Sequence, residues 1–107
     1  MIKQADPVRA PVALAAVPAL RGAVEAAQLE LLANPFDEMV VNRVLVHLAG
    51  ALRPVREQLV EMAEAQPGGP VATVLAHLGT AYARAAADQT GAAVAGVFTA
   101  AAAVKGL

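Results

Sequence analysis

Apolar residues recur every three or four positions between residues 17 and 31, which is the spacing of one face of an α-helix. The residues of this stripe are Val17, Leu20, Val24, Ala27 and Leu31. The pattern predicts a helix that ends near Ala33. Pro18 lies inside the possible start of this helix and either kinks it or occupies its first turn, so residues 18–33 form the secure part.

The segment from Asn34 to Glu38 marks the boundary to a second helix. Asn34 is a suitable N-cap, and Pro35 suits the first helical position. The carboxylates of Asp37 and Glu38 favour the positive end of a helix dipole. Because this connection is very short, we expect the first two helices to form an antiparallel hairpin.

The second helix carries the most regular pattern in the chain. Its apolar residues alternate spacings of four and three, as in a heptad repeat, over about three repeats. The residues of this seam are Val41, Leu45, Leu48, Leu52, Val55, Leu59 and Met62. Pro54 interrupts the helix but lies off the seam, so we expect a kink near residues 50–54 that tilts the helix and leaves the seam on one side. The seam either packs inside the chain's own bundle or pairs with another chain.

Two further helices follow a break at Gln66–Pro70, where proline and glycine are concentrated. The apolar face of the third helix, which begins at Pro70, consists of Val71, Val74, Leu75, Leu78, Tyr82 and Ala85. That of the fourth helix consists of Val94, Val97, Phe98, Ala101 and Val104.

A single helix over residues 70–105 is the alternative to two. Its apolar face would turn by about 200° between Leu78 and Phe98, which leaves a rod that is apolar on opposite sides of its two halves. A break at residues 88–91, with Asp88 or Thr90 as the cap, explains the pattern more simply.

These elements predict an all-α fold, a small four-helix bundle in which a hairpin of helices 1 and 2 is followed by helices 3 and 4. Residues 1–11 contain Pro7 and Pro11 and show no periodicity, so we expect an extended N-terminal arm there. Residues 12–107 then form a single helical domain, because 107 residues suffice for one ordinary domain and not for two.

The composition adds an indication of association between chains. Hydrophobic residues make up 58% of the chain and charged residues 16%, which is apolar for a chain of this size. Alanine, with 28 copies, accounts for much of this excess and lies on helix surfaces as readily as in cores. Valine and leucine, with 15 and 12 copies, are the core material. Since aromatic residues are only 3%, we expect helices that pack closely through small side chains.

The net charge of −1 gives no long-range attraction to nucleic acid or to an anionic membrane. The longest uncharged stretch near the C-terminus, residues 89–104, is shorter than the roughly 20 residues of a membrane span. The N-terminus lacks the pattern of a signal peptide. We therefore expect no membrane span, no nucleic-acid partner, and a location in the cytoplasm or within a viral or secreted assembly.

Few residues are suited to carry chemistry. The chain has no cysteine and no serine, which excludes thiol and serine nucleophiles and cysteine-ligated metals. His47 and His77 lack the spacing of a zinc pair, and valine stands three residues before each, where a Glu-x-x-His di-metal motif needs glutamate. Glu57, Glu61 and Glu64 are expected to form a solvated face. We expect no catalytic site, no cofactor and no metal.

These patterns favour a non-enzymatic structural or assembly protein that packs through its helix faces into a homo-oligomer or a larger complex, for example in a virion or a secreted assembly. The expected interaction residues are the seven seam residues with Val97 and Phe98. A small regulatory adaptor or DNA-binding accessory protein is the alternative, and an enzyme with a pocket between helices is a distant third. The abundance of alanine, valine, arginine, glycine and proline is typical of a GC-rich genome, such as that of an actinobacterium or its phages.

Overall fold

The structure is a computed structural model that describes residues 9–34 and 36–107. Within those ranges it contains helices and no strand. In chain order the helices are α1 (Arg9–Ala33), α2 (Glu38–Leu52), the short 3-10 helix η1 (Arg53–Val55), α3 (Arg56–Ala65), α4 (Pro70–Ala86) and α5 (Thr90–Val104). The predicted all-α fold is therefore confirmed.

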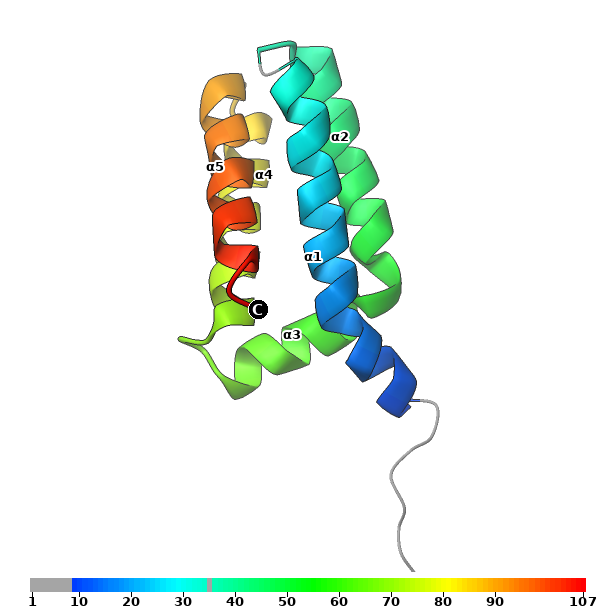
Figure 1. Cartoon of the computed structure of the whole chain (residues 1–107). Helices are drawn as coiled ribbons and strands as arrows, with labels where there is room; N and C mark the ends of the chain where they lie inside the picture. Colours follow the sequence, from blue (N-terminus) through cyan, green and yellow to red (C-terminus); the bar gives the residue numbers. More distant parts are fainter. Residues whose placement is uncertain (1–8, 35) are drawn as a thin grey trace, which may run out of the picture.

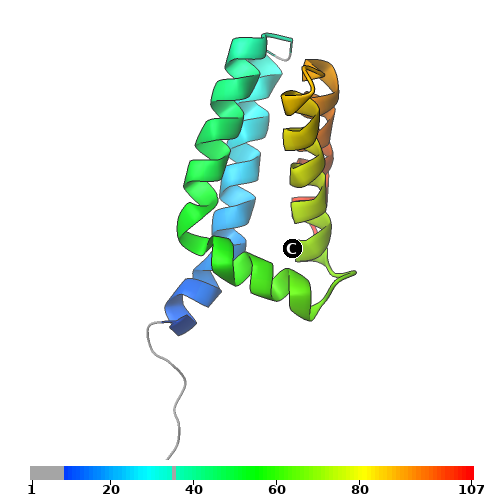
Figure 2. The ribbon, with the colours of Figure 1, turned by 180° about the vertical axis from the view of Figure 1, so that it is seen from behind.

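The four longer helices stand as two antiparallel hairpins, α1–α2 and α4–α5 (Figure 1). The short helix α3 connects the hairpins and lies across one end of the bundle, whereas the turn between α1 and α2 lies at the opposite end (Figures 1 and 2). α1 packs against both α2 and α5, and α4 packs mainly against α5, while α2 and α4 barely touch. This is the small four-helix bundle that the periodicity predicts.

α1 is longer than its apolar stripe suggests. It begins at Arg9 and so includes residues 9–11, which the sequence assigns to the extended arm. Pro11 is tolerated in the first turn because the N–H groups there have no partner inside the helix. Pro18 lies inside α1 rather than at its start. The rest of the predicted arm, residues 1–8, lies outside the described residues.

Asp37 is the N-cap of α2, so the expectation that Asn34 caps this helix is wrong. The backbone of Asp37 is extended, and its Oδ1 accepts hydrogen bonds from the N–H groups of Met39 and Val40, at 3.0 and 3.3 Å. This side chain satisfies two of the donors that a helix N-terminus leaves free. Glu38, in the first turn, adds a second carboxylate near the positive end of the helix dipole.

The second predicted helix is divided in two. α2 ends at Leu52, η1 carries Pro54, and α3 then runs in a different direction, across the end of the bundle (Figure 1). The sequence predicts only a tilt here, whereas the helix axis changes direction fully. The reason is that the proline and the tighter 3-10 turn interrupt the regular helix. The seam nevertheless continues on the inner side, since Val55 and Leu59 are buried.

The break predicted at residues 88–91 is confirmed, since α4 ends at Ala86 and α5 begins at Thr90. Asp88 has a left-handed backbone with φ of 60°, and the N–H of Gln89 donates to the carbonyl of Arg84 at 2.9 Å. This geometry is a Schellman C-cap of α4. Gln89 precedes α5 and makes no side-chain cap, so the expectation that Asp88 or Thr90 caps α5 is wrong.

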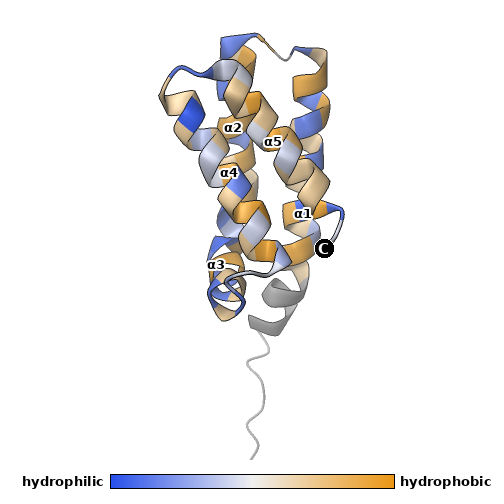
Figure 3. Cartoon of the chain, turned by 90° about the vertical axis from the view of Figure 1, so that its left-hand side faces the viewer, coloured by the Kyte–Doolittle hydropathy of each residue, from blue (hydrophilic) through white to orange (hydrophobic). Residues whose placement is uncertain are grey.

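α4 and α5 approach closely at Gly96. A Cβ atom at this position would lie 3.0 Å from the Cβ of Ala81 and 3.1 Å from its Cα. Figure 3 shows that α5 has almost no strongly hydrophilic residue along its length. The contact between these helices thus depends on alanine and glycine, in keeping with the expected packing through small side chains.

All buried side chains of the described residues are alanine, valine or leucine. The bulkiest of them that are closed to solvent are Leu20, Leu31 and Leu59, which come from α1 and α3. No helix within the described ranges combines the length and the apolar character needed to cross a membrane.

Candidate functional site

The structure places the predicted interaction residues in or beside the chain's own core. Six of them are buried, namely Val41, Leu45, Leu48, Val55, Leu59 and Val97. The other three, Leu52, Met62 and Phe98, are partly buried and pack against the same core. The seam therefore closes the bundle of its own chain, which is one of the two alternatives that the heptad pattern allows. Contact of enclosed residues such as Val41 and Val97 with another chain would require the bundle to open, whereas Leu52 and Leu59 also line an open pocket that is described below.

The histidine and glutamate side chains that are suited to chemistry lie on different helices. His47 is exposed on α2, beside a shallow depression between α1 and α2, and His77 is half-buried on α4. Glu57, Glu61 and Glu64 are exposed on α3. Among the described residues, no group of three or more histidine, aspartate or glutamate side chains is placed to hold a metal ion.

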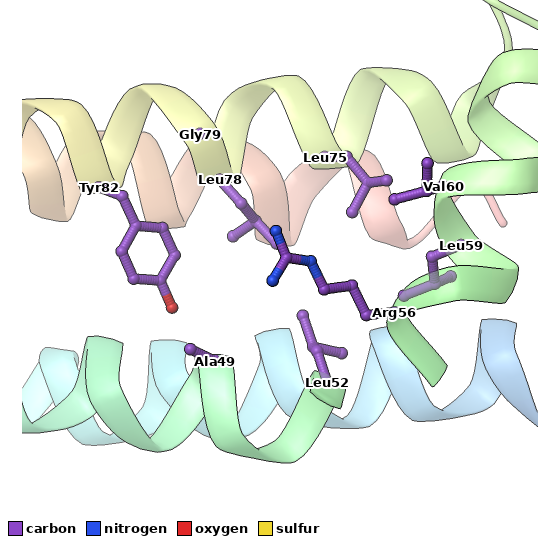
Figure 4. Close-up of a pocket in the computed structure, with 9 residues that line it drawn as sticks. All are labelled: Ala49, Leu52, Arg56, Leu59, Val60, Leu75, Leu78, Gly79 and Tyr82. Carbon is purple, nitrogen blue, oxygen red and sulfur yellow. The ribbon is translucent and has the colours of Figure 1, made fainter. Parts of the chain in front are cut away.

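A pocket of about 370 Å³ opens between α2 and α4. α3 crosses the end of the bundle and forms the third wall, so the pocket exists because the chain changes direction at η1 (Figure 4). Its lining is mostly apolar and includes Leu52 from α2, Leu59 and Val60 from α3, and Leu75 and Leu78 from α4. We call this site the α2–α4 pocket.

Arg56 is the one charged residue in the lining of the α2–α4 pocket among the described residues. It lies in the first turn of α3, and its side chain extends between Leu52 and Leu78 with the guanidinium group inside the pocket (Figure 4). No carboxylate shares this lining, although Glu57, Glu61 and others border a neighbouring shallow depression that Arg56 also borders. The pocket is therefore apolar with one positive charge.

Tyr82 closes the other end of the α2–α4 pocket (Figure 4). Its hydroxyl donates a hydrogen bond to the backbone carbonyl of Leu45, which ties α4 to α2. Burial raises the pKa of the phenol above its ordinary value of 10.0, and a hydrogen bond with the backbone of Ala49 opposes part of this rise. Tyr82 therefore stays protonated at neutral pH and serves as a donor to α2 rather than as a base.

Tyr82→Phe is expected to make the stability of the protein less sensitive to alkaline pH. The pKa of Tyr82 in the folded protein lies above 10.0, the value for the unfolded chain. The protonated phenol therefore contributes to the free energy of unfolding below the unfolded pKa, and this contribution is lost as the pH rises through the folded pKa. At neutral pH the variant should lose only one hydrogen bond, about 0.5–1.5 kcal/mol. Urea unfolding at about pH 8 and about pH 11 measures both effects, since other titrating groups are common to the two proteins. If the wild type and the variant lost the same free energy of unfolding between the two pH values, Tyr82 would not have a raised pKa in the folded protein.

Four large apolar side chains are exposed at the end of the bundle where α1 meets α2. Leu29 and Leu32, in the last turns of α1, are 69% and 58% exposed. Phe36, in the turn, and Met39, in the first turn of α2, are 84% and 82% exposed. We call these four residues the apolar tip. Because exposed large apolar side chains that gather in one region often mark a site of protein contact, the apolar tip is a candidate docking surface.

Acidic residues stand next to the residues of the apolar tip along the chain. Glu30, Asp37 and Glu38 are all exposed and lie between or beside the four apolar residues in the sequence. Asp37 is engaged by the backbone of α2, which leaves the carboxylates of Glu30 and Glu38 for other contacts. The end of the bundle that carries the apolar tip thus also carries negative charge.

The sequence pattern misses both the apolar tip and the α2–α4 pocket. Leu29 and Leu32 lie close to the buried Leu31 in the sequence but do not belong to the apolar stripe of the helix. Their position outside the stripe is the feature of the sequence that predicts their exposure. Phe36 stands beside a turn, where a large aromatic has no core to enter. The pocket depends on the direction of α3, which no local pattern in the sequence indicates.

Comparison with known proteins adds no relative to this description. No model of a known protein family matches the chain, and no curated protein or solved structure matches it either.

Proposed function

We propose that this chain is a non-enzymatic assembly protein, whose copies associate with one another through the apolar tip. The observation that carries the proposal is the gathering of Leu29, Leu32, Phe36 and Met39 at one end of the bundle, each more than half exposed. Burial of such side chains contributes about 25 cal/mol per Å² of apolar surface removed from water, so contact between copies is favoured. The apolar composition of the chain points in the same direction.

The dispersion of the polar groups supports assembly rather than catalysis. The α2–α4 pocket contains Tyr82 and Arg56, but His47 and His77 lie outside its lining. General acid–base or nucleophilic chemistry needs a reactive group within hydrogen-bond reach of a partner that activates it. Tyr82 instead uses its hydroxyl to hold α4 to α2, and Arg56 is suited to bind an anion.

The mass of the protein in solution tests this proposal. Light scattering or sedimentation of the wild-type chain is expected to show a mass that rises with concentration from the micromolar range upward. Phe36→Asp should weaken this association by about 2 kcal/mol, or roughly 30-fold, because it places a charge where an aromatic anchor is buried between copies. Since Phe36 is 84% exposed, the fold itself should be unaffected.

Val46→Asp provides the matched control. Val46 is also a large apolar residue on an exposed position, 68% open to solvent, but it lies in the middle of α2, about two helical turns beyond Met39. This variant should associate as the wild type does. A wild-type chain that remains a monomer at every concentration, or equal effects of the two substitutions, would overturn the proposal.

A further inference from the structure

We propose that the α2–α4 pocket receives the apolar tip of a neighbouring copy, so that the copies assemble head to tail. The inference rests on the proposed function, because it names the surface against which the tip docks. It pairs the exposed side chains of the apolar tip with the open apolar lining of the α2–α4 pocket, neither of which is covered by the chain's own helices.

The two surfaces agree in size and polarity. Phe36 and Met39 are the most exposed of the large apolar residues that the structure describes, so most of their surface is open to a partner. The α2–α4 pocket measures about 370 Å³ and its walls are formed largely by leucine and valine. Pockets of about 300 Å³ and more are large enough for a small ligand, so this pocket has room for an aromatic side chain. Aromatic residues seated in such pockets commonly dominate the energy of an interface.

The charges of the two surfaces are complementary as well. Glu30 and Glu38 are exposed and follow or precede tip residues directly in the chain, and Arg56 places its guanidinium inside the α2–α4 pocket (Figure 4). A carboxylate that enters with the tip meets this guanidinium and can form a charge-assisted hydrogen bond. Two tips that face each other would instead bring like charges together, which disfavours a tip-to-tip dimer.

The linings of the two hollows beside Arg56 favour one of them for an acidic tip. The neighbouring shallow depression combines Arg53 and Arg56 with Glu57, Glu61 and Glu64. The α2–α4 pocket offers Arg56 with no carboxylate in its lining, so an acidic tip is favoured between α2 and α4. This is the side into which the guanidinium of Arg56 extends (Figure 4).

The positions of the two surfaces determine the type of assembly. The apolar tip belongs to the connected ends of α1 and α2, and the α2–α4 pocket has part of its lining in α3. The turn between α1 and α2 and the helix α3 lie at opposite ends of the bundle (Figures 1 and 2). A copy that inserts its tip into a neighbour keeps its own pocket open for a third copy. Such a contact between two different surfaces is heterologous and produces rings or filaments rather than a closed dimer.

Mixing two defective variants tests the inference. Phe36→Asp replaces the aromatic residue of the apolar tip by a charge and leaves the pocket intact. Gly79→Leu fills the pocket and leaves the tip intact, and a Cβ at Gly79 meets no atom within 4 Å, so the variant should fold. Each variant alone is expected to be a monomer. An equimolar mixture should form a complex of one copy of each and nothing larger, because only one productive contact remains.

Gly22→Leu is the matched control for the filled pocket. Gly22 is exposed on α1 with open space around its Cβ position, as at Gly79, but it is not part of the pocket. This variant should associate like the wild type, as should Arg53→Glu, since Arg53 borders only the neighbouring depression.

A charge exchange provides a second measurement that does not depend on Gly79. Arg56→Glu should weaken association about tenfold or more, because the pocket would then repel the acidic tip. Adding Glu38→Arg in the same chain should restore most of the lost affinity. Both residues are exposed, so neither change should disturb the core.

The outcomes separate this inference from the proposed function. If Phe36→Asp abolishes association but Gly79→Leu and Arg56→Glu associate as the wild type does, the tip docks elsewhere, and the head-to-tail inference is overturned while the proposed function stands. A mixture that stays monomeric also overturns the inference. If Phe36→Asp associates normally, the proposed function itself fails, and the inference fails with it.

Discussion

Leu31→Ala is expected to lower the free energy of unfolding by about 3 kcal/mol, since it removes a leucine closed to solvent from the core between the helices. The loss combines the lost burial of the removed carbon atoms with the cavity that they leave. For a domain of this size it corresponds to a fall in melting temperature of roughly 12–24 °C. Thermal and urea unfolding followed by circular dichroism measure it directly.

Leu32→Ala is the control, because it makes the same substitution at the next residue. Leu32 is 58% exposed and belongs to the apolar tip, so its removal should change stability by no more than about 0.5 kcal/mol. It should, however, weaken association between copies. Equal stability losses in the two variants would contradict the placement of Leu31 in the core and of Leu32 on the surface.

Gly96→Val is expected to destabilise the chain by about 2–3 kcal/mol. A side chain at Gly96 would press on the backbone of α4, since even its Cβ would lie 3.1 Å from the Cα of Ala81. A backbone atom cannot turn aside as the end of a flexible side chain can, so α4 and α5 would have to separate. The cost of this overpacking exceeds the few tenths of a kcal/mol that valine gains over glycine in helix propensity.

Gly79→Val separates this steric effect from helix propensity. Gly79 also lies inside a helix, α4, but a Cβ there meets nothing within 4 Å. The variant should therefore be as stable as the wild type or slightly more stable. Urea unfolding of the two variants measures the difference in their free energies of unfolding. A Gly96→Val protein of wild-type stability would show that α5 does not pack against Ala81 as described.

The helices and their ends could largely be predicted from the sequence, because their determinants are local. Pro70 begins α4 as expected, and the break near Asp88 follows from a rotation of the apolar face that a single helix cannot accommodate. The caps were less predictable. Asn34 and Asp37 are both good N-caps by residue type, and only the conformation of the turn decides between them.

The change of direction at η1 escapes the heptad pattern for a physical reason. Spacings of three and four residues report which side of a helix is apolar, and they carry no information about the direction of its axis. When Pro54 ends α2, Val55 and Leu59 still face inward, so the seam reads as unbroken although α3 lies across the bundle. The α2–α4 pocket is a product of that turn and is equally hidden from the sequence.

The exposed residues of the apolar tip could not be predicted from the periodic pattern either. The most regular apolar residues of the chain, such as Leu45 and Leu48, serve its own core. The exposed apolar residues, such as Phe36 and Met39, belong to no periodic pattern. Regular spacing thus identifies the apolar face that a helix turns toward its own bundle, whereas the exposed side chains of the apolar tip are recognised only once the helices are placed in space.

The close packing of α4 on α5 also bears on the order of events in folding. The two helices are joined by residues 87–89 alone, so their docking closes a very short loop at little cost in chain entropy. α1 and α5 are in contact too, but their docking joins opposite ends of the chain. Because the connection between α1 and α2 is short as well, we expect the two hairpins to form first and the docking of α1 on α5 to come last, within the microsecond-to-millisecond range typical of helical bundles.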